Sequence, residues 1–155
     1  MKVLIRDYPK NTWYQKLLNK IFRFYYLKQK PRPSIVEIDS QDLWNLDCTL
    51  ALIIKPALEK FLENEVGSFQ VDNKDLPGRM TIDWEAYWDS NNEFHKETFL
   101  RAEDAWKWIL KEMIFAFDLT IRDNKGEIIK YDSPDHKRME NGLRLFGKYF
   151  RSLWN

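Results

Sequence analysis

The chain has 155 residues and a formal net charge of +1, and 44% of its residues are hydrophobic and 15% aromatic. This composition is typical of a folded soluble protein that can bury a core. The single cysteine, Cys48, excludes an internal disulfide framework and a cysteine-based zinc site. No stretch approaches the roughly 20 apolar residues that a membrane-spanning helix needs, so we expect no membrane partner.

The charges are unevenly distributed along the chain. Residues 1–32 contain nine Lys or Arg and one acid, whereas residues 33–118 contain eight bases and eighteen acids. A basic opening segment either steers anionic partners such as phosphates or neutralises the acidic middle of the chain. Met1–Ile5 leads into charged sequence and not into the apolar region of a signal peptide. We therefore expect cytoplasmic residence.

The first half of the chain predicts two short strands and a long helix. Lys2–Arg6 and Ser34–Ile38 are β-branched runs, and an amphipathic helix predicted at residues 11–27 lies between them, so we expect parallel pairing. Residues 42–64 have helical apolar spacing, with Asp42 as the expected N-cap and a proline inside the helix. The same spacing places Asp47 in the middle of the apolar arc, where a carboxylate needs a partner, a ligand or a proton.

The second half predicts a long connection and two more helices. Residues 66–92 form the kind of connection that is often a lid, a binding loop or an oligomer arm, and their aromatic cluster predicts that they pack onto the protein. The helix predicted at residues 93–118 is apolar on a second side at Trp108 and Phe115, so it either is central or touches a second subunit. Residues 121–131 indicate a hairpin or an ordered loop.

Ser133 and Pro134 are a helix start, and the last helix is predicted to reach about Leu153. The predicted fold is therefore mainly α (α+β): one domain over residues 1–155, with about four helices, a two-stranded N-terminal β element and a long ordered loop. The second apolar side at Trp108 further predicts a homo-oligomer.

Motifs of common enzymes do not occur in the chain. There is no Gly-rich phosphate loop, no GxSxG elbow and no HExxH motif. We therefore predict no catalytic residue, no metal and no cofactor. One catalytic alternative stays open, in which Asp47 and Glu112 converge to hold magnesium in a nucleotide hydrolase. In the other interpretation Asp47 is hydrogen-bonded to a neighbouring helix or paired with a base.

A nucleotide-like ligand needs flat side chains for its bases, cations for its phosphates and polar groups for a base edge or a sugar. The chain offers candidates for each role: Trp44, Trp108 and Tyr149 for stacking; Arg138, Arg144 and Lys148 for phosphate; Asn45, Asp47 and Glu112 for polar contacts. In the alternative interpretation the aromatic residues belong to the core and the basic stripe of the last helix is a solvated face. Nucleic acid itself is not an expected partner.

Four stretches together resemble a family of small uncharacterised proteins from tailed bacteriophages and environmental viral sequence. They are IVEIDSQDLWNLDCTLALIIKPALEKF, VDNKDLP, WKWILKEMIFAFD and NGLRLFGKYFRSLW. The resemblance covers most of the chain, although Cys48 stands where the relatives usually have His.

The resemblance implies a phage accessory protein in the cytoplasm of an infected bacterium. Small phage proteins without catalytic motifs often act by binding host enzymes or immune signals. We therefore expect an anti-defence protein that sequesters a nucleotide-derived immune signal, such as a cyclic oligonucleotide or an ADP-ribose derivative, without cleaving it. The alternatives are a protein–protein inhibitor or virion-associated factor, and the magnesium-dependent hydrolase.

Overall fold

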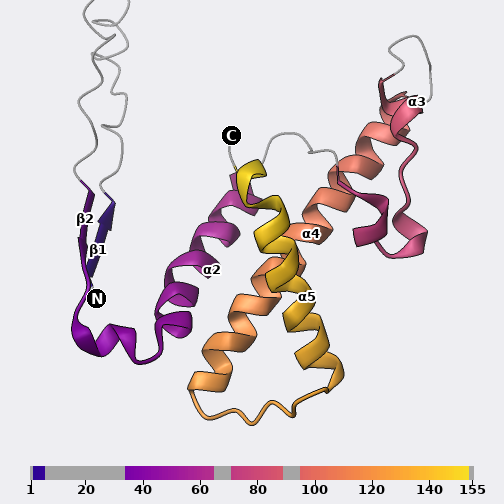
Figure 1. Ribbon diagram of the computed structural model, residues 1–155. Helices are drawn as coiled ribbons and strands as arrows, with labels where there is room; N and C mark the ends of the chain where they lie inside the picture. Colours follow the sequence, from indigo (N-terminus) through magenta and orange to yellow (C-terminus); the bar gives the residue numbers. More distant parts are fainter. Residues whose placement is uncertain (1, 6–33, 65–70, 89–94, 154–155) are drawn as a thin grey trace, which may run out of the picture. The chain divides into compact units, whose positions relative to one another are not determined.

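The computed structural model describes residues 2–5, 34–64, 71–88 and 95–153 (Figure 1). The chain divides into two compact units, Met1–Asn45 and Leu46–Asn155. Most of the described residues are helical, which confirms the predicted mainly α class. The expectation of a single domain stays a prediction. In the described part of the chain, no helix is both long enough and apolar enough to cross a membrane.

The first unit contains β1 (Lys2–Ile5) and β2 (Ser34–Glu37), which pair antiparallel with Lys2 opposite Glu37. The two-stranded element was predicted, but its parallel direction was wrong. Strand composition does not encode direction, and a long connection can return the chain either way. The helix predicted at residues 11–27 lies outside the described residues.

A short 3-10 helix, η1 (Ser40–Leu43), precedes the main helix. The Asp39 side chain accepts from the backbone N–H of Gln41, and the Asp42 side chain accepts from the backbone N–H of Asp39. This reciprocal capping box assigns Asp42 to η1 and not to the start of the main helix. The predicted N-cap role of Asp42 was therefore wrong.

The main helix, α2 (Leu46–Asn64), buries a narrower side than the sequence predicts. Its buried residues are Cys48, Ala51 and Leu58, whereas Leu46 and Leu50 remain 42% and 45% exposed. Asp47 is also exposed. The expectation that Asp47 lies in a buried arc was wrong, because the first turns of α2 are uncovered on that side and water solvates the carboxylate.

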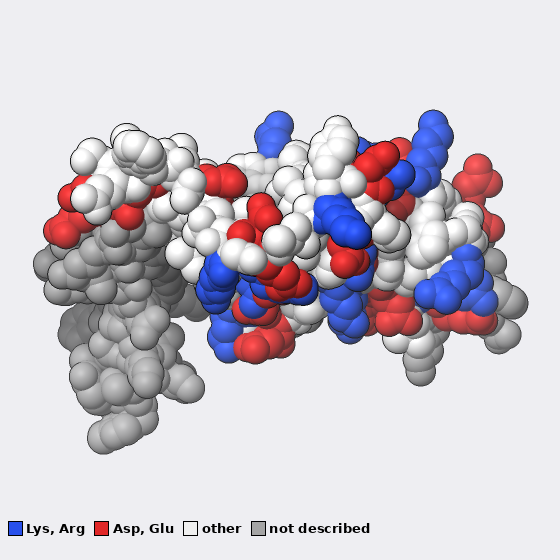
Figure 2. Space-filling view, turned by 90° about the horizontal axis from the view of Figure 1, so that it is seen from below, with Lys and Arg blue, Asp and Glu red and all other residues white. Residues whose placement is uncertain are grey.

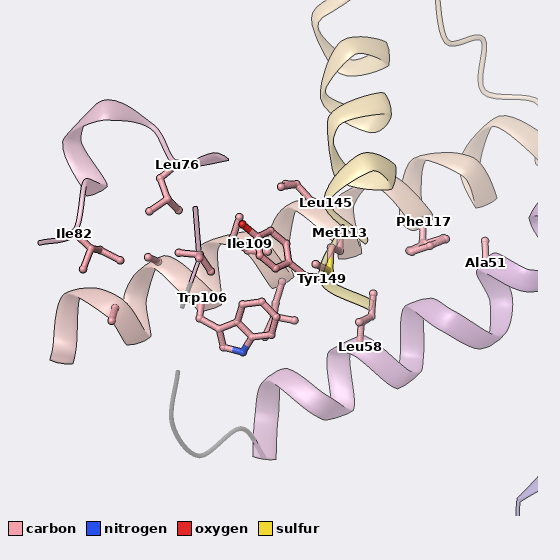
Figure 3. Packing of buried hydrophobic residues seen from close by; sticks show 14 residues of the cluster. Ala51, Leu58, Leu76, Ile82, Trp106, Ile109, Met113, Phe117, Leu145 and Tyr149 are labelled. Atoms are coloured by element: carbon pink, nitrogen blue, oxygen red, sulfur yellow. The ribbon is translucent and has the colours of Figure 1, made fainter. Parts of the chain in front are cut away.

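The longest of the described helices, α4 (His95–Asn124), contacts α2, α3 (Trp84–Trp88) and α5 (Pro134–Tyr149) (Figure 1). Its fully buried side chains include Trp106, Ile109 and Met113. Figure 3 shows Leu58 of α2 and Leu145 of α5 pointing into this cluster. Of the two alternatives for this helix, the central position is the one that the structure shows.

Helix α4 is longer at its C-terminal end than predicted. Residues 121–124 continue the helix, because Ile121 follows Phe117 at helical spacing and is packed against the core. Gly126 then has a φ of +92°, a conformation that glycine adopts without a steric cost. The residues predicted as a hairpin or an ordered loop therefore form a helix end followed by a connection, and no strand occurs among them.

Helix α5 begins as predicted. The Ser133 side chain accepts from the backbone N–H of His136 at 3.2 Å, and Pro134 is in the first turn. A Cβ atom added at Gly142 would lie 2.4 Å from the backbone oxygen of Glu112 and 2.7 Å from the Cβ of Ala116. Glycine at this position therefore lets α5 approach the backbone of α4 closely.

The described part of the long connection is ordered and packs onto α4, as predicted. It contains two 3-10 helices, η2 (Asn73–Asp75) and η3 (Gly78–Met80), before α3. Val71, Leu76 and Ile82 are buried in the core cluster. The ring of Tyr87 in α3 stacks on Phe99 of α4, with centroids 6.2 Å apart.

Candidate functional site

A buried carboxylate, that of Asp75, lies where the connection meets α5. Its side chain is 5% exposed. Asp72 initiates η2, because its side chain accepts from the backbone N–H of Lys74 at 3.0 Å. The turn ends at Asp75 with Leu76 as its C-cap, and Pro77 precedes η3 as its N-cap. The local sequence thus produces a tight turn that holds Asp75 against the helix.

Three side chains of α5 donate to this carboxylate. The guanidinium of Arg144 lies 2.8 Å from one oxygen of Asp75. The Tyr149 hydroxyl donates to the other oxygen at 2.7 Å, and the Lys148 ammonium donates to that same oxygen. Arg144 and Lys148 are one helical turn apart, so they lie on the same side of α5. The carboxylate is fully bonded.

Asp72 adds a second, more exposed acid. Its carboxylate accepts from Lys148 at 3.1 Å, and its backbone N–H donates to the Tyr149 hydroxyl at 2.9 Å. We name Asp72, Asp75, Arg144, Lys148 and Tyr149 the Asp75 cluster. It contains two carboxylates and two cations, so its formal charges cancel.

The cluster fixes the protonation of its members. Burial would raise the pKa of Asp75, but the hydrogen bonds from Lys148, Tyr149 and Arg144 outweigh it and hold this pKa below its usual value. The hydrogen bond to Asp75 raises the pKa of Lys148 well above its usual value. Burial, together with the hydrogen bond to Asp75, raises the pKa of Tyr149. At neutral pH the acid is ionised, the lysine is charged and the tyrosine is neutral.

An open hollow of about 410 Å³ lies beside the cluster, lined by Val71, Asp72, Asn73 and Trp84. Its volume is within the range of small-molecule sites, about 300–1,000 Å³. The Asn73 amide donates to the backbone oxygen of Ile82 at 2.8 Å and accepts from its N–H at 2.9 Å, which fixes one wall. The indole N–H of Trp84 is buried and has no acceptor among the described residues.

A second buried carboxylate, that of Glu112 in α4, contacts the other end of α5. Arg138 donates to both of its oxygens, at 2.8 and 2.7 Å. The Arg138 guanidinium also lies 3.8 Å from the centre of the Phe115 ring. The Glu112 side chain is 8% exposed. This contact is a bidentate ion pair whose guanidinium lies over the ring of Phe115, one of the two residues of the second apolar side of α4.

The structure distributes the predicted ligand residues over several places. Arg144, Lys148 and Tyr149 meet in the Asp75 cluster, whereas Arg138 and Glu112 meet at the other end of α5. Ten residues separate Arg138 from Lys148, which corresponds to about 15 Å along a helix. These cations therefore serve two contacts and not one.

None of the remaining candidates, Trp44, Asn45, Asp47 and Trp108, belongs to α5. Trp108 is partly buried against the core, and Asp47 is exposed on α2. Trp44 is 89% exposed and, with Asn45, belongs to the first unit. The ring of Tyr149 is buried edge-on to Trp106, with centroids 5.9 Å apart, so its hydroxyl is the part that serves the cluster.

The convergence of Asp47 and Glu112 that a hydrolase would need is not present. Both oxygens of Glu112 are bonded to Arg138, and Asp47 is solvated on another helix. In the described part of the chain, no three His, Cys, Asp or Glu residues are grouped so that they could hold a metal ion. The geometry therefore gives the hydrolase alternative no support.

Asp72, Asp75 and Trp84 were not predicted as site residues. The acids lie in the VDNKDLP stretch, where an Asp that precedes a turn and a following proline is a readable signal. Figure 2 shows basic and acidic side chains interleaved on the face in view, without a broad patch of one sign.

Comparisons with protein-family models, with curated proteins and with solved structures gave no match. The relation to phage proteins therefore stays a resemblance.

Proposed function

We propose that this protein binds a nucleotide-derived ligand, without cleaving it, in the hollow beside the Asp75 cluster. The observation that carries the proposal is that the hollow is lined by an indole and by an acid that pairs with a lysine. Trp84 lines the hollow, and Lys148 contacts its lining residue Asp72 at 3.1 Å. A flat base would pack against the indole while the partly exposed lysine faces a phosphate.

The other groups of this site suit recognition better than bond cleavage. The Asn73 amide lines the hollow, and beyond its two hydrogen bonds with Ile82 it has a further hydrogen and a further lone pair that suit a sugar hydroxyl or a base edge. Asp75 has its two oxygens occupied by three donors, so it is poorly placed to act as a base. With the resemblance to phage proteins, this favours a protein that sequesters an immune signal in the host cytoplasm.

The test is thermal melting against a panel of cyclic di- and trinucleotides and ADP-ribose derivatives. A ligand at a hundred times its Kd stabilises the protein by about 2.7 kcal/mol. For a domain of this size, that raises the melting temperature by several degrees. Recovery of the compound intact supports sequestration, whereas its recovery cleaved would replace the proposal with a hydrolase.

A pair of lysine variants locates the binding. We expect Lys148→Gln to lose the ligand-induced rise in melting temperature, because it removes the cation beside the hollow. Lys137→Gln removes a lysine from the same helix that pairs with Asp132 at 3.2 Å, and it should keep the full rise. Glutamine is preferred to glutamate at position 148, since a third acid beside Asp75 would also destabilise the fold.

A panel without any active compound would overturn the proposal. A protein–protein inhibitor would then be the better candidate, because Leu46, Leu50 and Leu52 of α2 are exposed apolar side chains.

A further inference from the structure

We propose that Asp72 occupies the phosphate position of this site before the ligand binds, so that Lys148 exchanges the Asp72 carboxylate for a phosphate of the ligand. This inference rests on the proposed function. It assigns a regulatory role to an acid at the edge of the hollow, and it defines the ligand as one whose phosphate competes with a carboxylate.

The two carboxylates that hold Lys148 differ in how firmly they are fixed. Asp75 is buried and also bonded to Arg144 and Tyr149. The side chain of Asp72 is 44% exposed, and that of Lys148 is 38% exposed. An ion pair that is accessible to water stabilises a protein little, so the contact with Asp72 is the one that a ligand can replace.

The oxygens of Asp72 have separate roles. Oδ1 accepts from the backbone N–H of Lys74 and so caps the turn, whereas Oδ2 accepts from Lys148. The exchange therefore changes the partner of Oδ2 only, and water can take the place of the ammonium. The turn and the buried contact with Asp75 remain in place.

The position of Asp72 also explains why the exchange matters for affinity. Asp72 lines the hollow, so its negative charge lies where an anionic ligand would enter. A phosphate bound at Lys148 would be repelled by this carboxylate at close range. Removal of the Asp72 charge should therefore tighten the binding of phosphate-containing ligands and leave a nucleoside without phosphate unaffected.

The variant Asp72→Asn tests this directly, because asparagine caps a helical turn as well as aspartate does but carries no charge. Calorimetric titration with ADP-ribose should give a Kd about three- to thirty-fold lower than for the wild type, the scale of one close like-charge contact at a partly exposed site. Titration with adenosine should give the same result for both proteins.

The matched control is Asp132→Asn. Asp132 is an exposed acid that precedes α5 and pairs with Lys137 of that helix, and its φ of 64° is one that asparagine tolerates. It should leave the Kd for ADP-ribose unchanged. A second variant, Asp72→Ser, keeps the cap with a different side chain and should tighten binding in the same direction.

The outcomes separate the two proposals. If ADP-ribose binds the wild type and Asp72→Asn binds it equally or more weakly, the exchange is overturned while the ligand site stands. If neither ADP-ribose nor any cyclic di- or trinucleotide binds the wild type or the Asp72 variants, the proposed function itself is overturned.

Discussion

Helix α5 holds two buried carboxylates, one near each end, by different means. Glu112 is bonded by a single bidentate arginine that also lies over the Phe115 ring. Asp75 shares three donors, and one of them, Lys148, is also bonded to Asp72 beside an open hollow. Both contacts join a buried acid to a partly exposed base of α5, since Arg138 is 46% and Lys148 38% exposed. The second differs in that its lysine also holds Asp72, which lines the hollow.

The Glu112 contact stabilises the packing of α5 on α4. The Asp75 contact can in addition take part in ligand binding. Because both oxygens of Glu112 accept from one guanidinium, an anionic ligand could bind Arg138 only in competition with that bidentate pair. In the Asp75 cluster Lys148 can exchange Asp72 for another anion while the buried Asp75 keeps its three donors. A second, exposed acid on the same lysine is therefore the feature that makes the second contact suitable for recognition.

The largest expected loss of stability comes from removal of the basic side chain at one contact or the other. Arg138→Met leaves the Glu112 carboxylate buried without its partner, which should destabilise the protein by about 3–5 kcal/mol. Lys148→Met leaves Asp75 with Arg144 and Tyr149 and should cost about 1–2 kcal/mol. Urea unfolding of both variants measures the difference. Equal losses would show that the two contacts do not differ as described.

Substitution of two glycines of α5 should change the stability by smaller amounts and in opposite directions. The two variants test how closely α5 packs on α4 between the two contacts. Gly142→Ala places a methyl group against the backbone of Glu112 and should destabilise by about 1–3 kcal/mol. Gly147→Ala meets no atom of the described chain within 4 Å and should stabilise by up to about 1 kcal/mol. The two urea midpoints should move in opposite directions. A loss of stability in Gly147→Ala would mean that this position is covered.

The sequence predicted elements whose signals are local. The Ser133–Pro134 start of α5, the helical spacing of α4 and the packed aromatic residues of the connection were all correct. The basic residues Arg144 and Lys148 were rightly placed on one side of a helix. These features depend on residues a few positions apart, which spacing and caps encode.

The features that were missed depend on contacts between distant segments. The local pattern of residues 72–75 does not show that they lie against α5, so the partners of Arg144 and Lys148 could not be assigned from the sequence. Asp47 was placed in a buried arc because spacing identifies a helix face but not how far its neighbours cover it. The wrong prediction of the direction of β2 relative to β1 has the same cause, because strand pairing depends on contacts between distant segments.

The most direct measurement is a titration with ADP-ribose and, separately, with a cyclic dinucleotide, followed by NMR of the tryptophan indole N–H signals. The Trp84 signal is assigned by comparison with Trp84→Phe. The account predicts that the Trp84 signal shifts saturably with one of these ligands while the Trp108 signal stays in place. A shift of Trp108 or Trp44 with Trp84 unchanged would place the ligand elsewhere and contradict the assignment of the hollow.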